Sequence, residues 1–600
     1  MCKMKIYISL FILIILILLS SCSNNSILEN FSEIYKEGFP PSPVNLRAKQ
    51  NGFAIELSWN IDSKDDNIKY HVFRSSNERG TRTRITDLAL SENNYIDYDV
   101  KADTSYWYWV KAYNNDGLGS NFSEGISILF KEEAYSFSKS LENGSGDVTI
   151  KDFGPDDFAL VLIYSTNDEA HREWNVERLS TETSGEILEY PNIESHSLDK
   201  MMETQTLFND RRNILSKSQH KYLLEKEAEL YQNHDTINQS TSLLTASKKD
   251  PSLGDIDTFK VYNGWFGYND ISAQLKGIGD HSLVWIDESI NISSDNINRM
   301  IDEFDRTIHP TLSSVFGRVP DAKTFPVLAN NCDKINILIT PLVAPSGQTW
   351  GIGQFNPNDL YSKENASNSN ERKILYIHNH DNAEDAIDIQ ISTIAHEFQH
   401  MIFYNEKVLN DKPFFAANAD IWINEGLSQL AEDLVGYGFL HGIIPHLNAY
   451  LSEPDKTSLI NWEFKIANYD ASYLFARYIY DRFGKEIISY IHNSNETYKD
   501  AIGSYAGTSF RELYEDWASA LFFDRYVNIK ESRYNFPSIE VPGVYGPRLY
   551  PGDSWENISV KGWSSIYTLI MPGNGSDLKI SIEGADKEGD LRMKVYWGRF

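Results

Sequence analysis

Five consecutive residues combine side chains that could bind a metal ion and activate water, namely His396-Glu397-Phe398-Gln399-His400. Residues four apart on a helix lie one above the other, so the imidazoles of His396 and His400 would project from one face. Two imidazole nitrogens on a single Zn²⁺ are the ordinary use of this spacing. Glu397 is offset by one residue and can reach water on the same metal. The pattern therefore predicts zinc-assisted hydrolysis with Glu397 as the general base.

A catalytic zinc usually keeps three protein ligands and one open position. No histidine follows His400 at the spacing that would make it a nearby third ligand. Glu425 is the better candidate, because a helix antiparallel to the first could present its carboxylate beside both imidazoles. The rival carboxylates are Glu406, on the first helix, and Glu432 or Asp433, about two turns beyond Glu425.

The zinc motif lies in an amphipathic helical pattern. Apolar residues recur at helical spacing at Ile387, Ile391, Ile394, Phe398 and Ile402. This stripe lies opposite the histidines and would seat the helix in the core. Two later stretches, Ile421 to Leu434 and Tyr473 to Phe483, continue the helical pattern, and an earlier helix is expected from about residue 295 to 316.

Strand patterns come before these helices. The short apolar or alternating runs are Phe259 to Val261, Leu283 to Ile286, Ile335 to Ile339 and Ile374 to Ile377. Strands first and helices afterwards predict an α+β catalytic unit over residues 255–530, with a helical C-terminal lobe.

The zinc motif and the downstream glutamate resemble the gluzincins, in which a later helix supplies the third ligand. Residues from about 260 to 522 further resemble the hyicolysin-like neutral zinc metallopeptidases. The matching blocks are FNPNDL (355–360), SNER (369–372), WINEGLS (422–428) and YDASYLF (469–475). The resemblance implies a gluzincin-like domain acting on proteins or peptides. Gluzincins often place a carboxylate four residues after the third ligand to orient a histidine, but here that position is Gln429, whose amide would accept more weakly.

Peptide hydrolysis also needs a donor for the developing oxyanion. Tyr469 is the first candidate, since it opens the next predicted helix, where gluzincins often use a tyrosine. The alternatives are Tyr473, His441 and His446.

Two other polar groups stand near these motifs. His378 and His380 lie at a strand end beside Asn and Asp, and we interpret them as a solvated loop or a minor metal contact. Calcium is a second candidate ion near the Asn- and Asp-rich residues 356–370, where no ligand spacing is diagnostic.

The flanking regions have β patterns. Residues 41–131 resemble a fibronectin type III domain, through Leu57-Ser58-Trp59 on the second strand and Tyr106 placed for a tyrosine corner. Residues 132–254 contain a β segment and then a charged helical or linker region, and residues 531–600 alternate as a small C-terminal β domain. We expect both the front domain and the tail to be dispensable for chemistry, since the fibronectin-like segment offers no ligand or base.

The first residues have the pattern of an export signal. An apolar run from Ile6 to Leu19 is too short to span a membrane and is typical of a signal-peptide core. It ends Leu19-Ser20-Ser21-Cys22, which resembles the lipobox of bacterial lipoproteins. The resemblance implies that residues 1–21 are removed, that the Cys22 thiol carries lipid, and that residues 22–40 are a tether. Membrane contact would be through this lipid, and the protein would lie outside the cytoplasm in the bacterial cell envelope.

Composition limits the other functions. The 600 residues predict several domains, and the net charge of −30 argues against nucleic-acid binding, which depends on clustered Lys and Arg. The sequence therefore favours a lipid-anchored zinc endopeptidase. The alternatives are a surface adhesion or scaffold lipoprotein with an inactive peptidase-like domain, and zinc-dependent hydrolysis of a non-peptide substrate. The retained base Glu397 disfavours the scaffold, because an inactive domain has no physical need for it.

Overall fold

The computed structural model describes residues 39–600 apart from short gaps and one long one. The gaps are 52–53, 64–66, 87–88, 98–99, 101–103, 116, 131–134, 142–143, 155–156, 170–171, 184–250, 264–266, 326–327, 330–332, 344–348, 350, 381–385, 411–420, 439–442, 527–532, 540, 542, 545, 547, 550, 571–574, 586–590 and 600. The predicted signal, Cys22, the tether and most of the charged region before residue 254 lie outside the described residues. No described helix is both long and apolar enough to cross a membrane.

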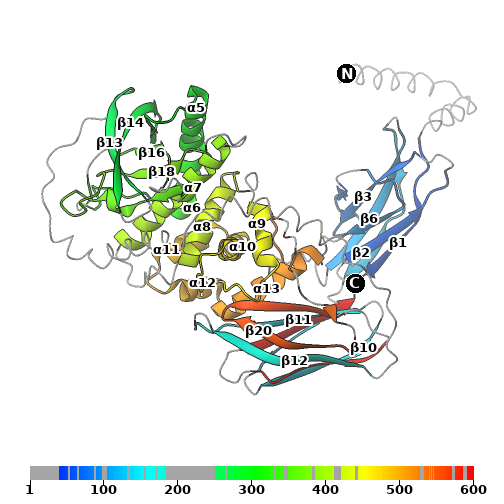
Figure 1. Cartoon of the computed structure of the whole chain (residues 1–600). Coiled ribbons are helices and arrows are strands. Elements are labelled where there is room, and N and C mark those ends of the chain that lie inside the picture. Colours follow the sequence, from blue (N-terminus) through cyan, green and yellow to red (C-terminus); the bar gives the residue numbers. More distant parts are fainter. Residues whose placement is uncertain are drawn as a thin grey trace, which may run out of the picture. The chain divides into compact units, whose positions relative to one another are not determined.

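The chain divides into two compact units, Met1–Glu133 and Ala134–Phe600. The first unit is the β-sandwich that its alternating pattern predicts (Figure 1). One sheet has the order β1 (Val44–Asn51), β2 (Ala54–Asn60), β5 (Asn94–Asp97). The other has the order β4 (Thr83–Arg84), β3 (Lys69–Ser75), β6 (Thr104–Tyr113), β7 (Gly119–Phe122), with β8 (Ile126–Phe130) also paired to β6. Leu57, Trp59 and Tyr106 are buried between the sheets, where the sequence places them.

The second unit contains a six-stranded mixed sheet. Its order is β13 (Ile256–Tyr262), β14 (Tyr268–Ile278), β15 (Ser282–Asp287), β16 (Ile335–Thr340), β18 (Ile374–His378), β17 (Gly353–Phe355). Three of the four inner strands, β15, β16 and β18, are parallel to one another. Every residue of β15 and β16 is buried, which accounts for their nearly continuous apolar sequences. β17 is antiparallel to β18 and ends the sheet order.

Helices cover this sheet and continue beyond it. Before the zinc motif lie α5 (Ser294–Glu303), a π-helical stretch η1 (Phe304–Ile308) and α6 (His309–Phe316). From the motif onward lie α7 (Ala386–Phe403), a second π-helical stretch η3 (Tyr404–Leu409), α8 (Ile421–Leu434), α9 (Ile443–Leu451), α10 (Ile466–Phe483), α11 (Lys485–Asn493), α12 (Tyr498–Ala506) and α13 (Phe510–Tyr526). Helices α5 and α6 lie between the parallel strands β15 and β16, so strands and helices are interspersed in this part of the chain. The helices from α7 to α13 all follow the last strand of the sheet, as the predicted helical C-terminal lobe requires.

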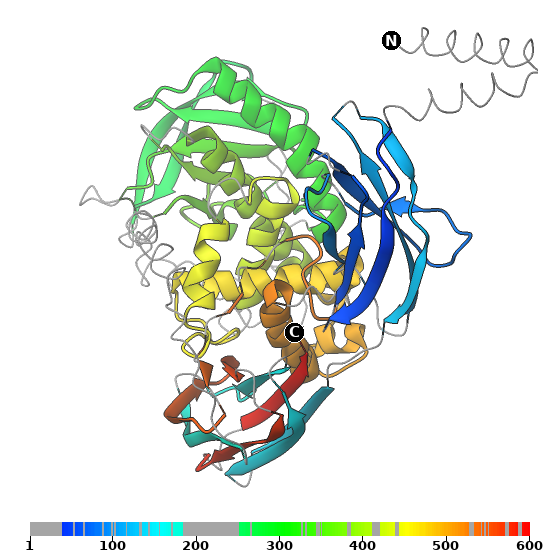
Figure 2. The same ribbon diagram turned by 90° about the vertical axis from the view of Figure 1, so that its right-hand side faces the viewer.

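A second β-sandwich corrects the predicted domain boundaries. Its sheets have the orders β10 (Ser145–Phe153), β22 (Ser576–Glu583), β12 (Glu173–Thr183), β20 (Ser554–Lys561) and β19 (Arg548–Leu549), β21 (Ser564–Ile570), β11 (Asp157–Ser165), β23 (Leu591–Arg599), β9 (Tyr135–Ser140). The strands before the catalytic region therefore pair with those after it (Figure 2). The β segment of 132–254 and the tail of 531–600 are one domain, not two.

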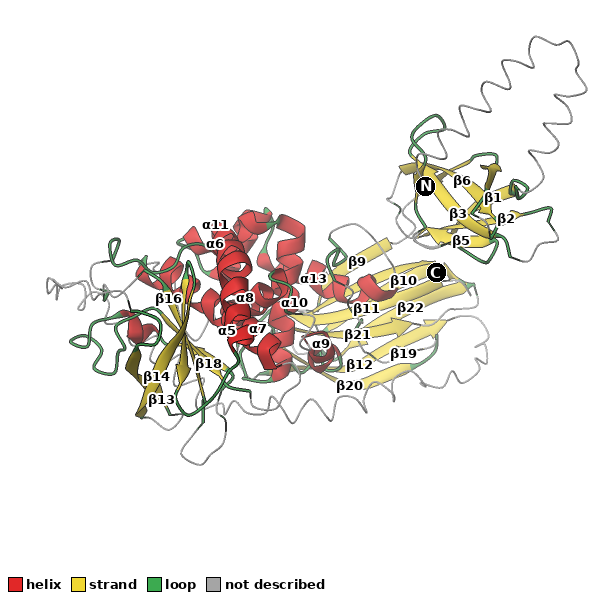
Figure 3. Cartoon of the chain, turned by 90° about the horizontal axis from the view of Figure 1, so that it is seen from above, coloured by secondary structure: helices red, strands yellow, loops and turns green. Residues whose placement is uncertain are grey.

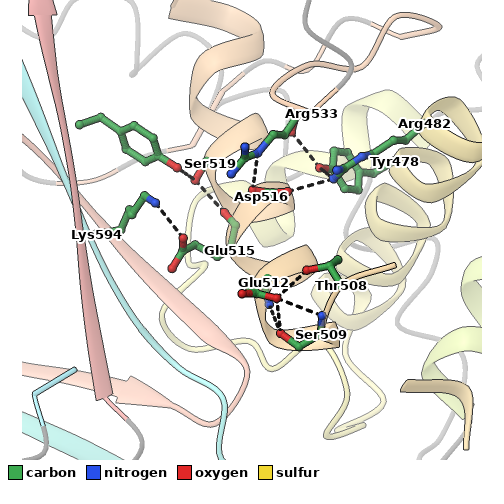
Figure 4. Close-up of polar contacts among 11 residues, drawn as sticks. Tyr478, Arg482, Thr508, Ser509, Glu512, Glu515, Asp516, Ser519, Arg533 and Lys594 are labelled. Carbon is green, nitrogen blue, oxygen red and sulfur yellow. Dashed lines mark hydrogen bonds and ion pairs between the residues drawn. The ribbon is translucent and has the colours of Figure 1, made fainter. Parts of the chain in front are cut away.

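The second sandwich packs against the helices through a buried, polar interface. In Figure 3 the helices of this unit lie between the mixed sheet and the sandwich. Glu515 on α13 forms an ion pair with Lys594 of β23 at 2.9 Å (Figure 4). The same carboxylate accepts from the hydroxyl of Tyr164 on β11. One turn later, the Ser519 and Tyr596 hydroxyls lie 2.6 Å apart. Helix α13 thus contacts strands from both chain segments that build the sandwich, the one before and the one after the mixed sheet and helices.

Candidate metal centre

Helix α7 carries the zinc motif and is fixed on both sides. Four residues of its apolar stripe are buried, namely Ile391, Ile394, Phe398 and Ile402, and the first, Ile387, is partly exposed. The ring of Phe398 packs against Phe304 at a centroid distance of 5.1 Å. The helix contacts β17 and β18 of the mixed sheet. On its other face it contacts α8, so the histidines project toward that helix.

The three predicted ligands lie together. His396 Nε2 is 3.4 Å from Glu425 Oε2, and His400 Nε2 is 3.9 Å from the same oxygen. Their ligand atoms all lie within 4.8 Å of one another. In the part of the chain that the structure describes, this is the one group of three or more His, Cys, Asp or Glu side chains that could hold a metal. The Glu425 side chain is 3% exposed and both imidazoles are less than one-fifth exposed, so the site is partly shielded from water.

Close approach of the helices sets the position of Glu425. At the next residue, Gly426, a Cβ atom would come 2.5 Å from the backbone oxygen of Ser472 on α10. Only glycine permits this contact, because a backbone oxygen cannot move away as a flexible side chain could. The position of Glu425 beside the histidines therefore depends on the packing of α8 between α7 and α10.

Both imidazoles are oriented by α8. Glu432 Oε1 lies 2.8 Å from His396 Nδ1, and its other oxygen accepts from the hydroxyl of Ser392. His400 Nδ1 lies 3.1 Å from Asn424 Oδ1. The hydroxyl of Ser428 lies almost equally far from the two ring nitrogens of His400, at 3.2 and 3.3 Å, so Asn424 is the partner that is specific to Nδ1. Bonds at Nδ1 leave Nε2 for a metal and fix the ring direction.

Sequence reasoning missed these orienting residues. The family resemblance placed the orienting residue four positions after Glu425, where this chain has Gln429, whereas the carboxylate that contacts His396 is Glu432. A signal was present, because Asn424, Ser428 and Glu432 are spaced by four and therefore share one stripe of α8. The stripe faces the similarly spaced residues of α7.

The rival carboxylates serve other purposes. Glu432 contacts His396 at Nδ1, not at the Nε2 atom that faces Glu425. Glu406 lies in η3 and accepts from the backbone N–H of Arg318 at 2.7 Å. Asp433 is paired with Arg477 at 3.1 Å.

Charge at the site favours a cation. Burial alone would lower the pKa of His396, but hydrogen bonds to the carboxylates of Glu425 and Glu432 and the charge of Glu397 raise it well above its usual value. Several carboxylates around one imidazole must be balanced by a positive charge, supplied either by a proton or by a metal ion. Two imidazole nitrogens and one carboxylate are a donor set that suits Zn²⁺ and leaves a coordination position open. The residues present therefore fit the metal.

Two of the four candidates for the oxyanion donor, Tyr469 and Tyr473, have side chains among the described residues. Tyr469 lies in the first turn of α10 and is half-buried, with its ring 4.7 Å from that of Trp462. The hydroxyl of Tyr473 donates to Asp433 at 3.0 Å in a buried site, so this alternative is already engaged. His441 and the side chain of His446 lie outside the described residues.

The second histidine pair is not a solvated loop. His378 Nδ1 accepts from the backbone N–H of Leu342 at 3.0 Å, and its ring packs edge-on against His380. Burial lowers the pKa of His380 to about 4, so this ring is neutral at physiological pH. The pair holds the end of β18 to the segment after β16.

The proposed calcium region uses its polar groups internally. The carboxylate of Asp359 accepts from the backbone N–H of Asn370 and from the hydroxyl of Tyr376, each at 2.6 Å. The amide of Asn370 also bonds both backbone groups of Lys260 on β13. These side chains hold the loop onto the sheet, and calcium there stays a prediction without further support.

Comparison with known proteins points to one enzyme class. Neutral metalloprotease ShpI of Staphylococcus hyicus is 27% identical to the chain over 286 residues, which cover 45% of this chain and 61% of that protein. The match thus spans less than two thirds of its relative. The similarity supports a metallopeptidase function. No protein-family model matches the chain.

Solved structures with fibronectin type III domains match a small part of the chain. A fibronectin type III-like protein from Clostridium thermocellum is 30% identical over 15% of this chain and 93% of its own, with a TM-score of 0.14. The fibronectin type III domain of a human protein is 21% identical over 16% and 89%, also with a TM-score of 0.14. These TM-scores are too low to support a conclusion, so the sandwich of the first unit rests on its own strand order.

Proposed function

We propose that the protein is a zinc-dependent endopeptidase of the gluzincin type. The observation that carries the proposal is the convergence of His396, His400 and Glu425, with each imidazole oriented from its Nδ1 side. The similarity to a neutral metalloprotease supports the same class of reaction. An adhesive scaffold gains nothing from this orientation, whereas a metal site requires both Nε2 atoms and the carboxylate to converge.

In this proposal, different residues bind the metal, transfer the proton and stabilise the oxyanion. His396, His400 and Glu425 would hold the metal, which when bound polarises the scissile carbonyl and lowers the pKa of water. Glu397 takes a proton from the attacking water and passes it to the leaving amine. In this proposal Tyr469 donates a hydrogen bond to the oxyanion. Glu432 keeps His396 in the tautomer whose Nε2 binds metal.

A peptide substrate is supported by the sheet beside the site. β17 ends the strand order among the described residues and passes close to Glu397. An extended peptide can add to such an edge through backbone hydrogen bonds. A non-peptide substrate would make no use of this strand.

The general base separates turnover from binding. Glu397→Gln keeps the size of the side chain but cannot accept a proton from water at neutral pH. We expect about one zinc per chain in the unmodified protein and in the Glu397→Gln variant alike. We also expect a fall of about 10²–10⁴-fold in kcat on an unstructured peptide. Zinc would be measured by atomic absorption and turnover by peptide cleavage, before and after chelation. Near-normal turnover in the zinc-loaded variant would refute the mechanism and leave the scaffold function as the better explanation.

The location and the front domain are also proposals. The lipobox-like Leu19-Ser20-Ser21-Cys22 supports lipid attachment outside the cytoplasm. The strand order of residues 41–130 supports a fibronectin type III domain. Mass spectrometry of the mature N-terminus would test the first, because a lipid on Cys22 changes its mass, whereas ordinary cleavage leaves a free thiol.

A further inference from the structure

A glycine on the edge strand lies directly against the proposed base. A Cβ atom built at Gly353 of β17 would come 2.6 Å from Glu397 Oε1 and 2.9 Å from Glu397 Cγ. It would also come 2.3 Å from Cγ2 of Thr393, one turn earlier on α7. Real Cβ atoms essentially never approach other atoms this closely, so any other side chain at this position requires a shift.

The strand cannot move away to make room. Gly353, Gln354 and Phe355 pair in register with Ile377, Tyr376 and Leu375 of β18. The backbone N–H of His378 donates to Ile352 at 2.8 Å. Phe355 packs into a buried cluster beside Tyr404, with a centroid distance of 6.0 Å. The pairing with β18 and the packing of Phe355 therefore hold β17 in place on the side away from α7.

On α7, the two side chains that a Cβ at Gly353 would meet differ in how freely they can move. Thr393 is β-branched, and its hydroxyl donates to the backbone oxygen of Ile389 at 2.7 Å, so its methyl group has little room to rotate. The carboxylate of Glu397 is the end of a flexible side chain. Of the groups that a Cβ would meet, it is therefore the one that can be displaced.

We propose that Gly353 is a positioning residue for the base: the absent side chain leaves the space in which the Glu397 carboxylate sits. The inference rests on the proposed peptidase function, because it concerns the group that activates water. His396 and His400, which would hold the metal, do not contact Gly353 among the atoms nearest its Cβ position. A side chain at Gly353 should therefore move the base and leave metal binding intact.

The test is Gly353→Ala in the full zinc-loaded protein, with Gly351→Ala as the matched control. A Cβ at Gly351 would meet its nearest atom at 3.4 Å, which is ordinary contact. We expect Gly353→Ala to retain zinc, to lose at least tenfold in kcat and to change KM far less. The control should stay within about twofold of the unmodified protein. Unchanged kcat in Gly353→Ala, or loss of its zinc, would overturn the proposal.

A second pair of variants tests whether the effect of Gly353→Ala acts through the Glu397 carboxylate or through the packing of α7. Thr393→Ser removes the methyl group nearest the new Cβ and keeps the hydroxyl. If Gly353 acts through Glu397, kcat of Gly353→Ala should stay low in the Thr393→Ser background. Recovery of turnover there would show that the effect passes through helix packing, and the proposal would fail.

Thermal unfolding gives a readout that does not depend on turnover. In the Thr393→Ser background, Gly353→Ala should lower Tm, and it should no longer do so once Glu397→Ala removes the carboxylate. An equal Tm loss with and without the carboxylate would contradict the proposed contact. Inactivity of the zinc-loaded unmodified protein would instead refute the peptidase function, so the two failures are distinguishable.

Discussion

Each imidazole of the candidate centre has a side-chain partner from α8 at its Nδ1 atom. Glu432 provides a charged acceptor for His396, while His400 has the weaker, uncharged partner Asn424. A carboxylate both fixes the tautomer and makes the imidazole a stronger donor to a metal. The two ligands are therefore not equivalent, and His396 depends more on its partner.

This asymmetry predicts the effect of losing one charge. Glu432→Gln should weaken zinc binding by about 10–100-fold, since an amide accepts less strongly than a carboxylate and does not add negative charge. Competition with a chromophoric chelator would measure the affinity. Glu406→Gln is the matched control, because Glu406 accepts from the backbone of Arg318 and an amide oxygen can do the same. Equal zinc affinity in the two variants would show that Glu432 does not orient the ligand.

At the scale of elements, the loop between β17 and β18 is attached to the sheet through a buried acid. Asp359 accepts from Tyr376 on β18 and from the backbone of Asn370, whose amide bonds Lys260 on β13. Burial raises the pKa of Asp359 to about 7, although these hydrogen bonds oppose the shift. The loop is thus held by a group that is costly to ionise.

The raised pKa predicts a pH dependence of stability. Below about pH 4 the carboxyl is protonated in both the folded and unfolded states and contributes no pH dependence. Between about pH 4 and 7 the unfolded chain releases the proton and the folded protein keeps it, so stability falls as pH rises.

Asp359→Asn should remove this contribution. We expect the free energy of unfolding of the unmodified protein to fall about 1–4 kcal/mol more than that of the variant between pH 5 and pH 8. Both proteins would be unfolded in urea with zinc chelated, so that metal binding does not enter the difference. Parallel pH dependences would show that Asp359 titrates normally.

At the scale of the whole molecule, the second sandwich joins two distant parts of the chain. β11 lies between β21 and β23, so its two neighbours both come from the C-terminal region. The turn between β20 and β21 also inserts Trp563 against Phe510 and Tyr514 of α13. The backbone oxygen of Trp563 accepts from Leu459, in the segment that leads to α10. The tail is thus part of the support of the catalytic helices.

This connectivity reverses the expectation that the tail is dispensable. Removing residues from 546 onward should leave β11 without neighbours and expose its buried residues, so we expect insoluble or unfolded protein. A chain that starts at residue 134 contains the complete second unit and should retain zinc and peptide cleavage. Solubility, zinc content and turnover of both truncations would be compared. A soluble, active protein without the tail would show that the sandwich is not required.

The sequence by itself determined which residues share a helix face. His396, Glu397 and His400 follow from a spacing that any α-helix converts into neighbouring side chains, and the apolar stripe of α7 follows from the same periodicity. The strands and helices of residues 255–530 were predictable for the same reason, because each of their patterns is local.

Only the tertiary structure decided how those faces meet. Glu425 and Glu432 are two turns apart on one helix, and the crossing of α7, α8 and α10 places one carboxylate at Nε2 of His396 and the other at Nδ1. The pairing of β10 with β22 likewise joins residues more than 400 positions apart, such as Ser145 and Glu583. An alternating strand pattern fits many partners equally well, so the packing of the complete sandwich selects the pairing.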